Sequence, residues 1–110
     1  MINLTPHPIT VRLPDGTDRT YPPDGSVARV SMQETVLYCT PDGVPVVRRT
    51  PGEVIGLPRN SAGIVPCLVS SMVLSALPAG TLNVYAPDTG PTAIRDERGQ
   101  VIAVTRLVVA

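Results

Sequence analysis

Short stretches of alternating apolar and polar residues run through the first half of the chain, and this alternation is typical of half-buried β-strands. Apolar side chains alternate with Thr and Arg over residues 9–13, and residues 17–21 could return antiparallel to them. Residues 26–31 and 35–39 are rich in β-branched side chains, and the second of these segments leads through a turn into residues 44–49. The pattern predicts two antiparallel hairpins.

The turns between these strands carry the tripeptide Pro-Asp-Gly, which occurs at residues 14–16, 23–25 and 41–43. Pro fixes φ at the first turn position, Asp accepts a backbone hydrogen bond, and Gly takes the positive φ that closes a tight turn. The unequal spacing of the three copies argues against an internal repeat, because repeat proteins keep a fixed period.

The pattern is less regular after residue 52. Residues 53–57 predict a short strand, residues 58–63 a polar loop, and residues 64–69 a continuously apolar central strand. Pro66 conflicts with a central position because it cannot donate a ladder hydrogen bond, so we expect it at an edge position or a bulge.

One segment, residues 70–77, has a helical pattern. Ser70 or Ser71 can act as its N-cap, and Pro78 and Gly80 end it after about two turns. An apolar stripe along the segment is formed by Met72, Val73, Ala76 and Leu77. We expect this short helix to pack against the strands.

The last quarter of the chain predicts a rigid loop at residues 86–91 and then a hairpin. In this hairpin, residues 92–95 and 101–109 flank a turn at residues 96–99. With 110 residues the chain is large enough for one core and too small for two. Residues 1–110 are therefore expected to form one compact, mostly β (α+β) domain of antiparallel hairpins with one short helix. We expect either a partly closed barrel or two packed sheets.

The charge balance narrows the range of partners. Nine Arg residues balance nine Asp and Glu residues, so the net charge is zero. The chain lacks the broad cationic field that non-specific nucleic-acid binding requires, and we expect no such binding. Any anion site must be local and formed by one or two arginines.

The hydropathy pattern indicates neither an export signal nor a membrane-spanning segment. Residues 1–4 have no secretory pattern, and the longest apolar stretch, residues 63–79, is interrupted by prolines and serines and is too short to span a bilayer. We therefore expect a cytoplasmic protein without membrane association, in which Cys39 and Cys67 are reduced, buried small apolar residues. In an oxidising compartment they could instead pair as a disulfide.

The only histidine, His7, lies between Pro6 and Pro8, which restrict the backbone on both sides. Its imidazole titrates near neutrality and could act as a general acid or base or contact a phosphate. Alternatively, backbone groups satisfy the imidazole and it holds the N-terminal segment in place. Thr5, two residues earlier, offers a hydroxyl beside it.

Three further places could bind an anion or a sugar. Ser70 and Ser71 at a helix N-terminus could hold a phosphate, or one of them could simply be the cap. Asp88 and Thr89, between two prolines, could contact a ribose, or their loop could be only a rigid turn. Two arginines are candidate phosphate ligands, Arg29 and Arg95, although Arg95 could instead pair with its neighbours Asp96 or Glu97.

Common catalytic and cofactor motifs are absent from the sequence. There is no Walker lysine, dinucleotide fingerprint, nucleophile elbow or zinc-protease motif. His7, Cys39 and Cys67 lack the paired spacing of a zinc site, and an apolar strand around Cys67 disfavours its thiolate. We expect no metal, no cofactor and no catalytic set, which favours a non-catalytic protein.

Several segments together resemble a widespread family of small, biochemically uncharacterised proteins of tailed phages and prophages. In order along the chain, the similarity rests on residues 3–9 (Asn-Leu-Thr-Pro-His-Pro-Ile), 27–31, 43–47, 52–54, 56–58, 69–71, 94–97 and 99–102. The resemblance implies a phage setting and a location in the cytoplasm of the infected bacterial host, and no mechanism. Residues 66–68 depart from the family pattern, in which an unbroken strand is usual.

Three functions follow from these features, in order of preference. The first is a homo-oligomeric binding module that sequesters a nucleotide-derived host defence signal. Its pocket would be shared between subunits and lined by Thr5, His7, Arg29, Ser70, Ser71, Asp88, Thr89 and Arg95. The second is a structural or adaptor phage protein that acts by protein–protein contact, in virion assembly or in inhibition of a host protein. The third is a small hydrolase that uses His7.

Overall fold

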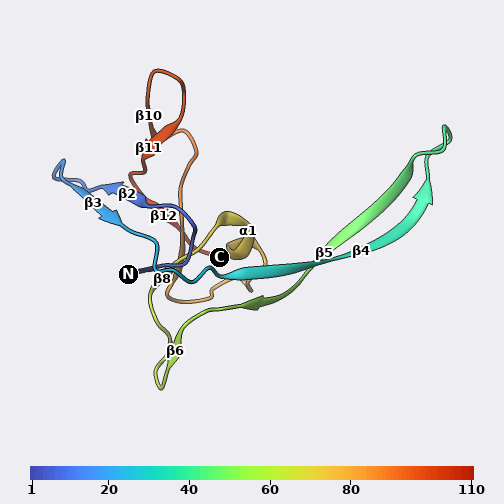
Figure 1. Ribbon diagram of the computed structural model, residues 1–110, viewed down its shortest axis with the longest axis horizontal. Helices are drawn as coiled ribbons and strands as arrows, with labels where there is room; N and C mark the ends of the chain where they lie inside the picture. The colour runs from blue at the N-terminus through green and yellow to red at the C-terminus, as the bar shows by residue number, and fades with distance from the viewer.

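The computed structural model describes all residues, 1–110, as a mostly β fold with one short helix, which confirms the predicted fold class. A small body carries a long two-stranded arm that projects to one side, and the N- and C-termini both lie in the body (Figure 1). The elements are β1 (Ile2–Asn3), β2 (Ile9–Arg12), β3 (Asp18–Tyr21), β4 (Arg29–Cys39), β5 (Pro45–Ile55), β6 (Arg59–Asn60), β7 (Gly63–Ile64), β8 (Cys67–Leu68), α1 (Ser71–Ser75), β9 (Val84–Pro87), β10 (Ile94–Arg95), β11 (Val101–Ala103) and β12 (Leu107–Val108).

The centre of the body is a four-stranded sheet in the order β1-β8-β9-β12. Strands β1, β8 and β9 are parallel, and β12 pairs antiparallel with β9. Cys67, Val69 and Val84 are completely buried in the larger core cluster, where α1 adds Val73 and Leu74. The strands are only two to four residues long, but burial of their apolar side chains removes them from water and makes this region the stable part of the fold.

A second, smaller core cluster joins the β2–β3 hairpin to the end of the chain. Ile9, Val11 and Val104 pack there around Leu68. The backbone N–H of Arg12 donates to Val104 at 2.8 Å, and the N–H of Val104 donates to Thr10 at 2.9 Å. The predicted hairpin of residues 9–21 therefore forms and is anchored to the body.

The prediction of a single central strand at residues 64–69 is wrong, because the strand is interrupted at Pro66. Gly63–Ile64 pairs in β7 with β6, and the chain resumes pairing only at Cys67–Leu68 in β8. Pro66 has no N–H to give to a ladder, and its carbonyl instead accepts a hydrogen bond from Ile2 at 3.3 Å.

The C-terminal run of residues 101–109 is also divided, into β11 and β12. Ala103 pairs with Ile94, whereas the N–H of Val104 turns to Thr10, so the chain changes partner at this point. It then rejoins the sheet where Leu107 faces Pro87. Residues 86 and 87, predicted as loop, consequently belong to β9.

The arm is the β4–β5 hairpin, residues 29–55, and it is longer than predicted. The two strands have eleven residues each, and the predicted short strand of residues 53–57 is largely the end of β5. Only the base of the arm packs on the core, through Val30 and Val54. The radius of gyration is accordingly 17.1 Å, against about 13 Å for a compact chain of this length.

Local signals at turns and caps are confirmed. Gly16 and Gly43 close hairpins with φ of +87° and +91°, whereas Gly25 joins β3 to β4 across two sheets. Ser70 is the N-cap of α1, and its Oγ accepts the N–H of Val73 at 3.3 Å. The predicted helical stripe is partly wrong, because the short helix buries Val73 and Leu74 and leaves Met72 exposed.

Candidate functional site

The N-terminal loop is organised by Asn3, a residue that is 1% exposed. Its Nδ2 donates to the carbonyl oxygens of His7 and Tyr21, both at 2.8 Å. Its Oδ1 accepts from the backbone N–H of Thr5 at 3.0 Å and from the Thr5 hydroxyl at 2.7 Å. Every hydrogen-bonding position of the amide is used, so Asn3 fixes the loop between β1 and β2.

Asn3 was not among the predicted site residues, although the sequence carries a signal for it. An Asn side chain that bonds the backbone two residues further on is a known turn-forming device, and Asn3 is followed at that distance by Thr5. Thr5 itself is buried, and its hydroxyl faces Asn3. Both residues therefore position the loop that presents His7.

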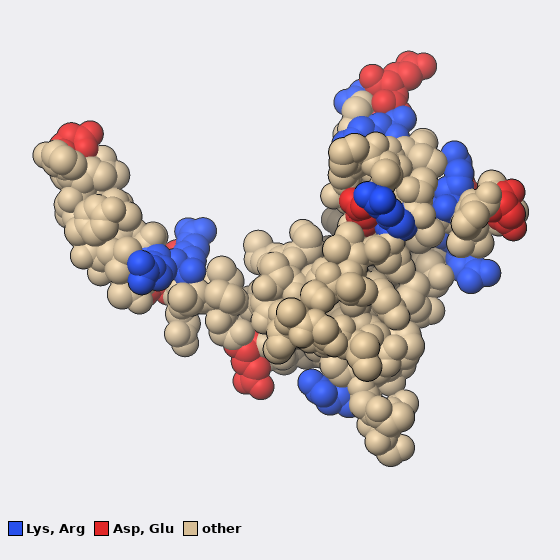
Figure 2. Space-filling view, turned by 180° about the vertical axis from the view of Figure 1, so that it is seen from behind, with Lys and Arg blue, Asp and Glu red and all other residues tan.

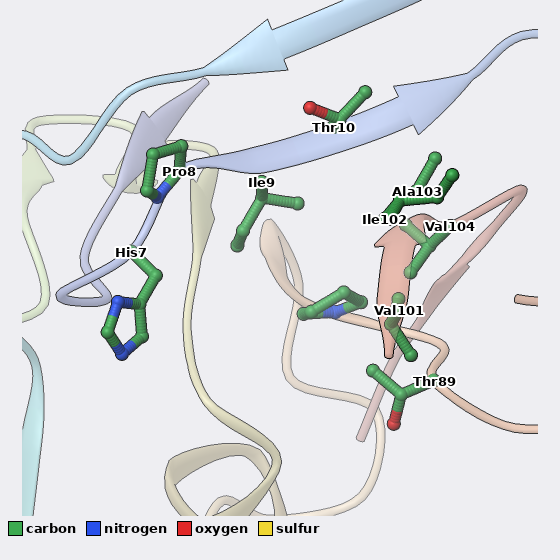
Figure 3. Close-up of a pocket in the computed structure, with 10 residues that line it drawn as sticks. His7, Pro8, Ile9, Thr10, Thr89, Val101, Ile102, Ala103 and Val104 are labelled. Atoms are coloured by element: carbon green, nitrogen blue, oxygen red, sulfur yellow. The ribbon is translucent and has the colours of Figure 1, made fainter. Parts of the chain in front are cut away.

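A cavity of about 340 Å³ lies where this loop and β2 meet β11. Figure 3 shows His7 and Thr89 on different sides of it, with Ile9 and Val101 among the apolar side chains around it. The complete lining is His7, Pro8, Ile9, Thr10, Pro87, Thr89, Val101, Ile102, Ala103 and Val104. No Arg, Asp or Glu side chain lines the cavity, which therefore suits an apolar or uncharged polar group.

His7 is exposed at one side of this cavity, and its side chain makes no hydrogen bond in the structure. A general base in a hydrolase is normally oriented by a second group, such as a carboxylate. The Asn3 contact holds the His7 backbone instead of the imidazole. His7 is therefore a polar group at the edge of an otherwise mostly apolar cavity.

Asp88, predicted to contact a ribose, is engaged within the protein. Its Oδ2 accepts from Arg106 Nε at 2.6 Å, and its Oδ1 accepts from the N–H of Gly90 at 3.0 Å. The Arg106 hydrogen bond is the main reason that the pKa of Asp88 is lowered, and the Gly90 bond acts in the same direction. Asp88 thus joins its loop to the segment before β12.

Arg95 also bridges two backbone segments. Its Nη1 donates to the carbonyl of Gly99 and its Nη2 to the carbonyl of Thr89, both at 2.8 Å. The alternative of an ion pair with Asp96 or Glu97 is not what the structure shows. Arg95 fixes the β10–β11 turn and the Thr89 loop relative to each other.

The remaining candidates lie away from the cavity. Arg29 begins β4 at the base of the arm, and Ser70 and Ser71 begin α1 beside the four-stranded sheet (Figure 1). Of the eight predicted site residues, the cavity lining brings together only His7 and Thr89.

The two cysteines occupy different environments. Burial raises the pKa of the Cys67 thiol, which is consistent with the inert role predicted for it. Cys39 was also expected to be buried, but it is exposed because it lies near the end of the arm, far outside the core. No three His, Cys, Asp or Glu side chains lie close enough together to hold a metal ion.

The most unusual surface of the molecule is the arm tip, defined as residues 36–47. Its exposed side chains are Val36 at 69%, Tyr38 at 61%, Val44 at 54%, and Leu37 and Val47 at 41% each. Asp42 in the turn is the only charged residue of this segment, and Figure 2 shows the outer part of the arm otherwise free of charge.

The arm surface becomes polar closer to the body. Glu34 and Arg49 face each other across the strands, with Glu34 Oε1 2.7 Å from Arg49 Nε, and Arg48 follows. Val36 pairs with Val47, and Met32 pairs with Pro51 on either side of this ion pair. By the two-residue period of a strand, Met32 and Val36 share a face of β4 with Val30, which packs on the core.

Comparison with known proteins identifies no relative: no family model, no curated protein and no solved structure matches the chain. None of the helices has the length and apolar character needed to cross a membrane.

Proposed function

We propose that this chain is a structural or adaptor protein of a phage that acts by protein–protein contact through the β4–β5 arm. The observation that carries the proposal is the arm tip, an apolar hairpin end that projects from the body with one charged residue in twelve. Virion assembly and inhibition of a host protein, the two phage roles considered from the sequence, both proceed through such contacts.

In the isolated chain, the arm adds almost nothing to the free energy of folding. An isolated two-stranded hairpin is marginally stable in water, and only the base of this one packs on a core. Contiguous exposed apolar surface on a soluble protein marks an interaction site or an aggregation hazard. A partner that covers the arm tip would bury these side chains and stabilise the hairpin along its whole length.

A site-specific photo-cross-linker tests this role in the infected bacterial cell. Placed at Val36, on the arm tip, it should give a covalent adduct with another polypeptide. Placed at Thr17, on the exposed turn of the β2–β3 hairpin, it should give none. An adduct yield at Val36 no higher than at Thr17 would refute the proposal, and the mass spectrum of any adduct identifies the partner.

A second candidate function is small-molecule binding at the cavity between His7 and Thr89. Its volume, about 340 Å³, lies at the lower end of the range of ligand pockets. A nucleotide-derived signal would need phosphate ligands in addition to this lining, and Arg95, which bonds to the carbonyl of Thr89, is one candidate.

Thermal shift against cyclic dinucleotides and ADP-ribose derivatives tests this second function. A ligand at about one hundred times its Kd adds about 2.7 kcal/mol to the free energy of unfolding. The melting temperature should rise for the wild type and rise less for Thr89→Val, which keeps the shape of the side chain and removes its hydroxyl. A flat response across the panel rejects this function and leaves the arm proposal untouched.

A further inference from the structure

The chain exposes more surface than a compact monomer of the same mass. A compact monomer of 11.6 kDa exposes about 5,800 Å², whereas this chain exposes 7472 Å². The excess, about 1,600 Å², is roughly twice the 800 Å² that one partner loses in a standard interface. Permanent assemblies bury areas of this size, so the arm is suited to an obligate contact more than to a brief encounter.

Further exposed apolar side chains lie on the body of the same chain. These side chains are on α1, on the loop that follows α1 and on the C-terminal segment. The loop and the C-terminal segment are joined by a hydrogen bond from the N–H of Gly80 to the carbonyl of Ala110, at 3.1 Å. We define this body patch as Met72 at 61% exposed, Leu82 at 77%, Val108 at 42% and Val109 at 59%.

The arm tip cannot cover the body patch of its own chain. The hairpin runs away from the body and ends at a distance from it (Figure 1), and its eleven-residue strands reach about 36 Å at 3.3 Å per residue. The two apolar surfaces therefore belong to one chain but can meet only between chains.

Charge does not oppose a contact between two copies. Residues 29–55 carry three Arg and three acidic residues, and the rest of the chain carries six of each, so arm and body are both neutral. A neutral arm can lie on a neutral body without like-charge repulsion, which would otherwise penalise self-association. Closed homo-oligomers, two-fold dimers above all, are the most frequent form of soluble oligomer.

We propose that the partner of the arm is a second copy of this chain, in a two-fold dimer in which the arm tip of each copy lies on the body patch of the other. This inference rests on the proposed function and names its partner. The dimer covers both apolar surfaces at once.

The oligomeric state of the purified full-length protein tests the proposal. Light scattering coupled to size-exclusion chromatography should give twice the chain mass of 11.6 kDa. An arm variant, Val36→Asp with Val47→Asp, and a body variant, Leu82→Asp, should each give the monomer mass. The control Thr17→Asp adds one negative charge to the β2–β3 hairpin, as Leu82→Asp does to the body, and should remain dimeric.

Mixing the two variants distinguishes arm-to-body contact from arm-to-arm pairing. In a mixed dimer the intact arm of the Leu82→Asp copy meets the intact body patch of the arm variant, so one of the two contacts is restored. A one-to-one mixture should therefore regain part of the dimer mass that neither variant shows alone. Arm-to-arm pairing predicts instead that Leu82→Asp, whose arm is intact, remains dimeric alone and that the arm variant does not enter dimers in the mixture.

Cross-linking gives a second measurement if a variant fails to fold. The photo-cross-linker at Val36 in a mixture of 14N- and 15N-labelled chains should join the two labels, with the adduct on peptides of the body patch. A monomeric wild type, or a dimer that both Asp variants leave intact, overturns the second-copy proposal. In that case an adduct with a different protein in the cell still supports the proposed function, whereas no adduct at Val36 removes both.

Discussion

The arm and the body separate two properties that usually occur together, regular hydrogen bonding and burial. The arm has the longest strands of the molecule, eleven residues each, yet none of its side chains is fully buried. The body has strands of two to four residues, yet it contains Cys67, Leu68, Val69 and Val84, all completely buried. The most regular part of the fold is thus the part with the least core.

This difference indicates which region stabilises the fold and which is available for contact. Backbone hydrogen bonds exchange water partners for protein partners and contribute modestly to the net free energy, whereas apolar burial provides most of it. The body should therefore fold without help from the arm. The arm should depend on a partner for its order, which leaves its sequence free to specify that partner.

The largest expected effect is a contrast between Leu68 and Val36. Leu68→Ala removes a completely buried side chain of the smaller core cluster, and truncations of this kind reduce the free energy of unfolding by about 3–5 kcal/mol. Val36→Ala should change it by less than about 0.5 kcal/mol, because surface positions rarely matter more. Urea denaturation, at a dilution at which the chain is monomeric, measures both values, and similar losses would show that the arm is part of the folding unit.

An intermediate change in the free energy of unfolding is expected for Asn3→Ala, with His7→Ala as the comparison. Asn3→Ala removes the partner of the Tyr21 carbonyl and of the Thr5 N–H and one of the two donors to the His7 carbonyl, in a partly buried loop, and we expect a loss of about 2–4 kcal/mol. His7→Ala removes an exposed side chain without a hydrogen bond, so the loss should stay below about 0.5 kcal/mol. The same urea titration compares them. A larger loss of unfolding free energy for His7→Ala than for Asn3→Ala would contradict the role of Asn3 in fixing the loop.

The sequence predicts those features of the body and arm that depend on neighbouring residues. The Pro-Asp-Gly turns at Gly16 and Gly43 and the cap at Ser70 follow from local backbone chemistry, and the structure contains all three. The interruption at Pro66 is also local in origin, because a residue without an N–H cannot continue a ladder, although the sequence alone left its register open.

The features that the sequence does not predict depend mostly on contacts between distant residues. Asp88 bonds to Arg106, eighteen residues away, so it is not free in the way that spacing alone indicated. The partners of Arg95 are only four and six residues away, but they are backbone carbonyls, which every residue has, so the side-chain pattern does not reveal them. The projection of the arm has the same origin as the Asp88 contact. Strand periodicity reports which residues alternate, but a hairpin with a core beneath it and one without can have the same pattern.

The smallest expected effect concerns the ion pair between Asp88 and Arg106, whose guanidinium is largely exposed. The hydrogen bond from Arg106 lowers the pKa of Asp88 in the folded protein below its usual value of 3.8. A lowered folded pKa means that the stabilisation is present above pH 3.8 and is lost as the pH falls through the folded value. Asp88→Asn should thus lower the melting temperature by only a few degrees near neutral pH, roughly what a weak surface pair provides.

The matched control for this pair is Asp24→Asn, which removes the same charge from an exposed turn where the carboxylate makes no hydrogen bond. Melting temperatures of the three proteins, measured from neutral pH downwards, should separate Asp88→Asn from the other two at neutral pH. The curves of Asp88→Asn and the wild type should then converge below pH 3.8, because the wild-type carboxylate is by then being protonated and loses its attraction to Arg106. A constant gap at all pH values would assign the effect to the Gly90 hydrogen bond and the loop shape instead of to charge.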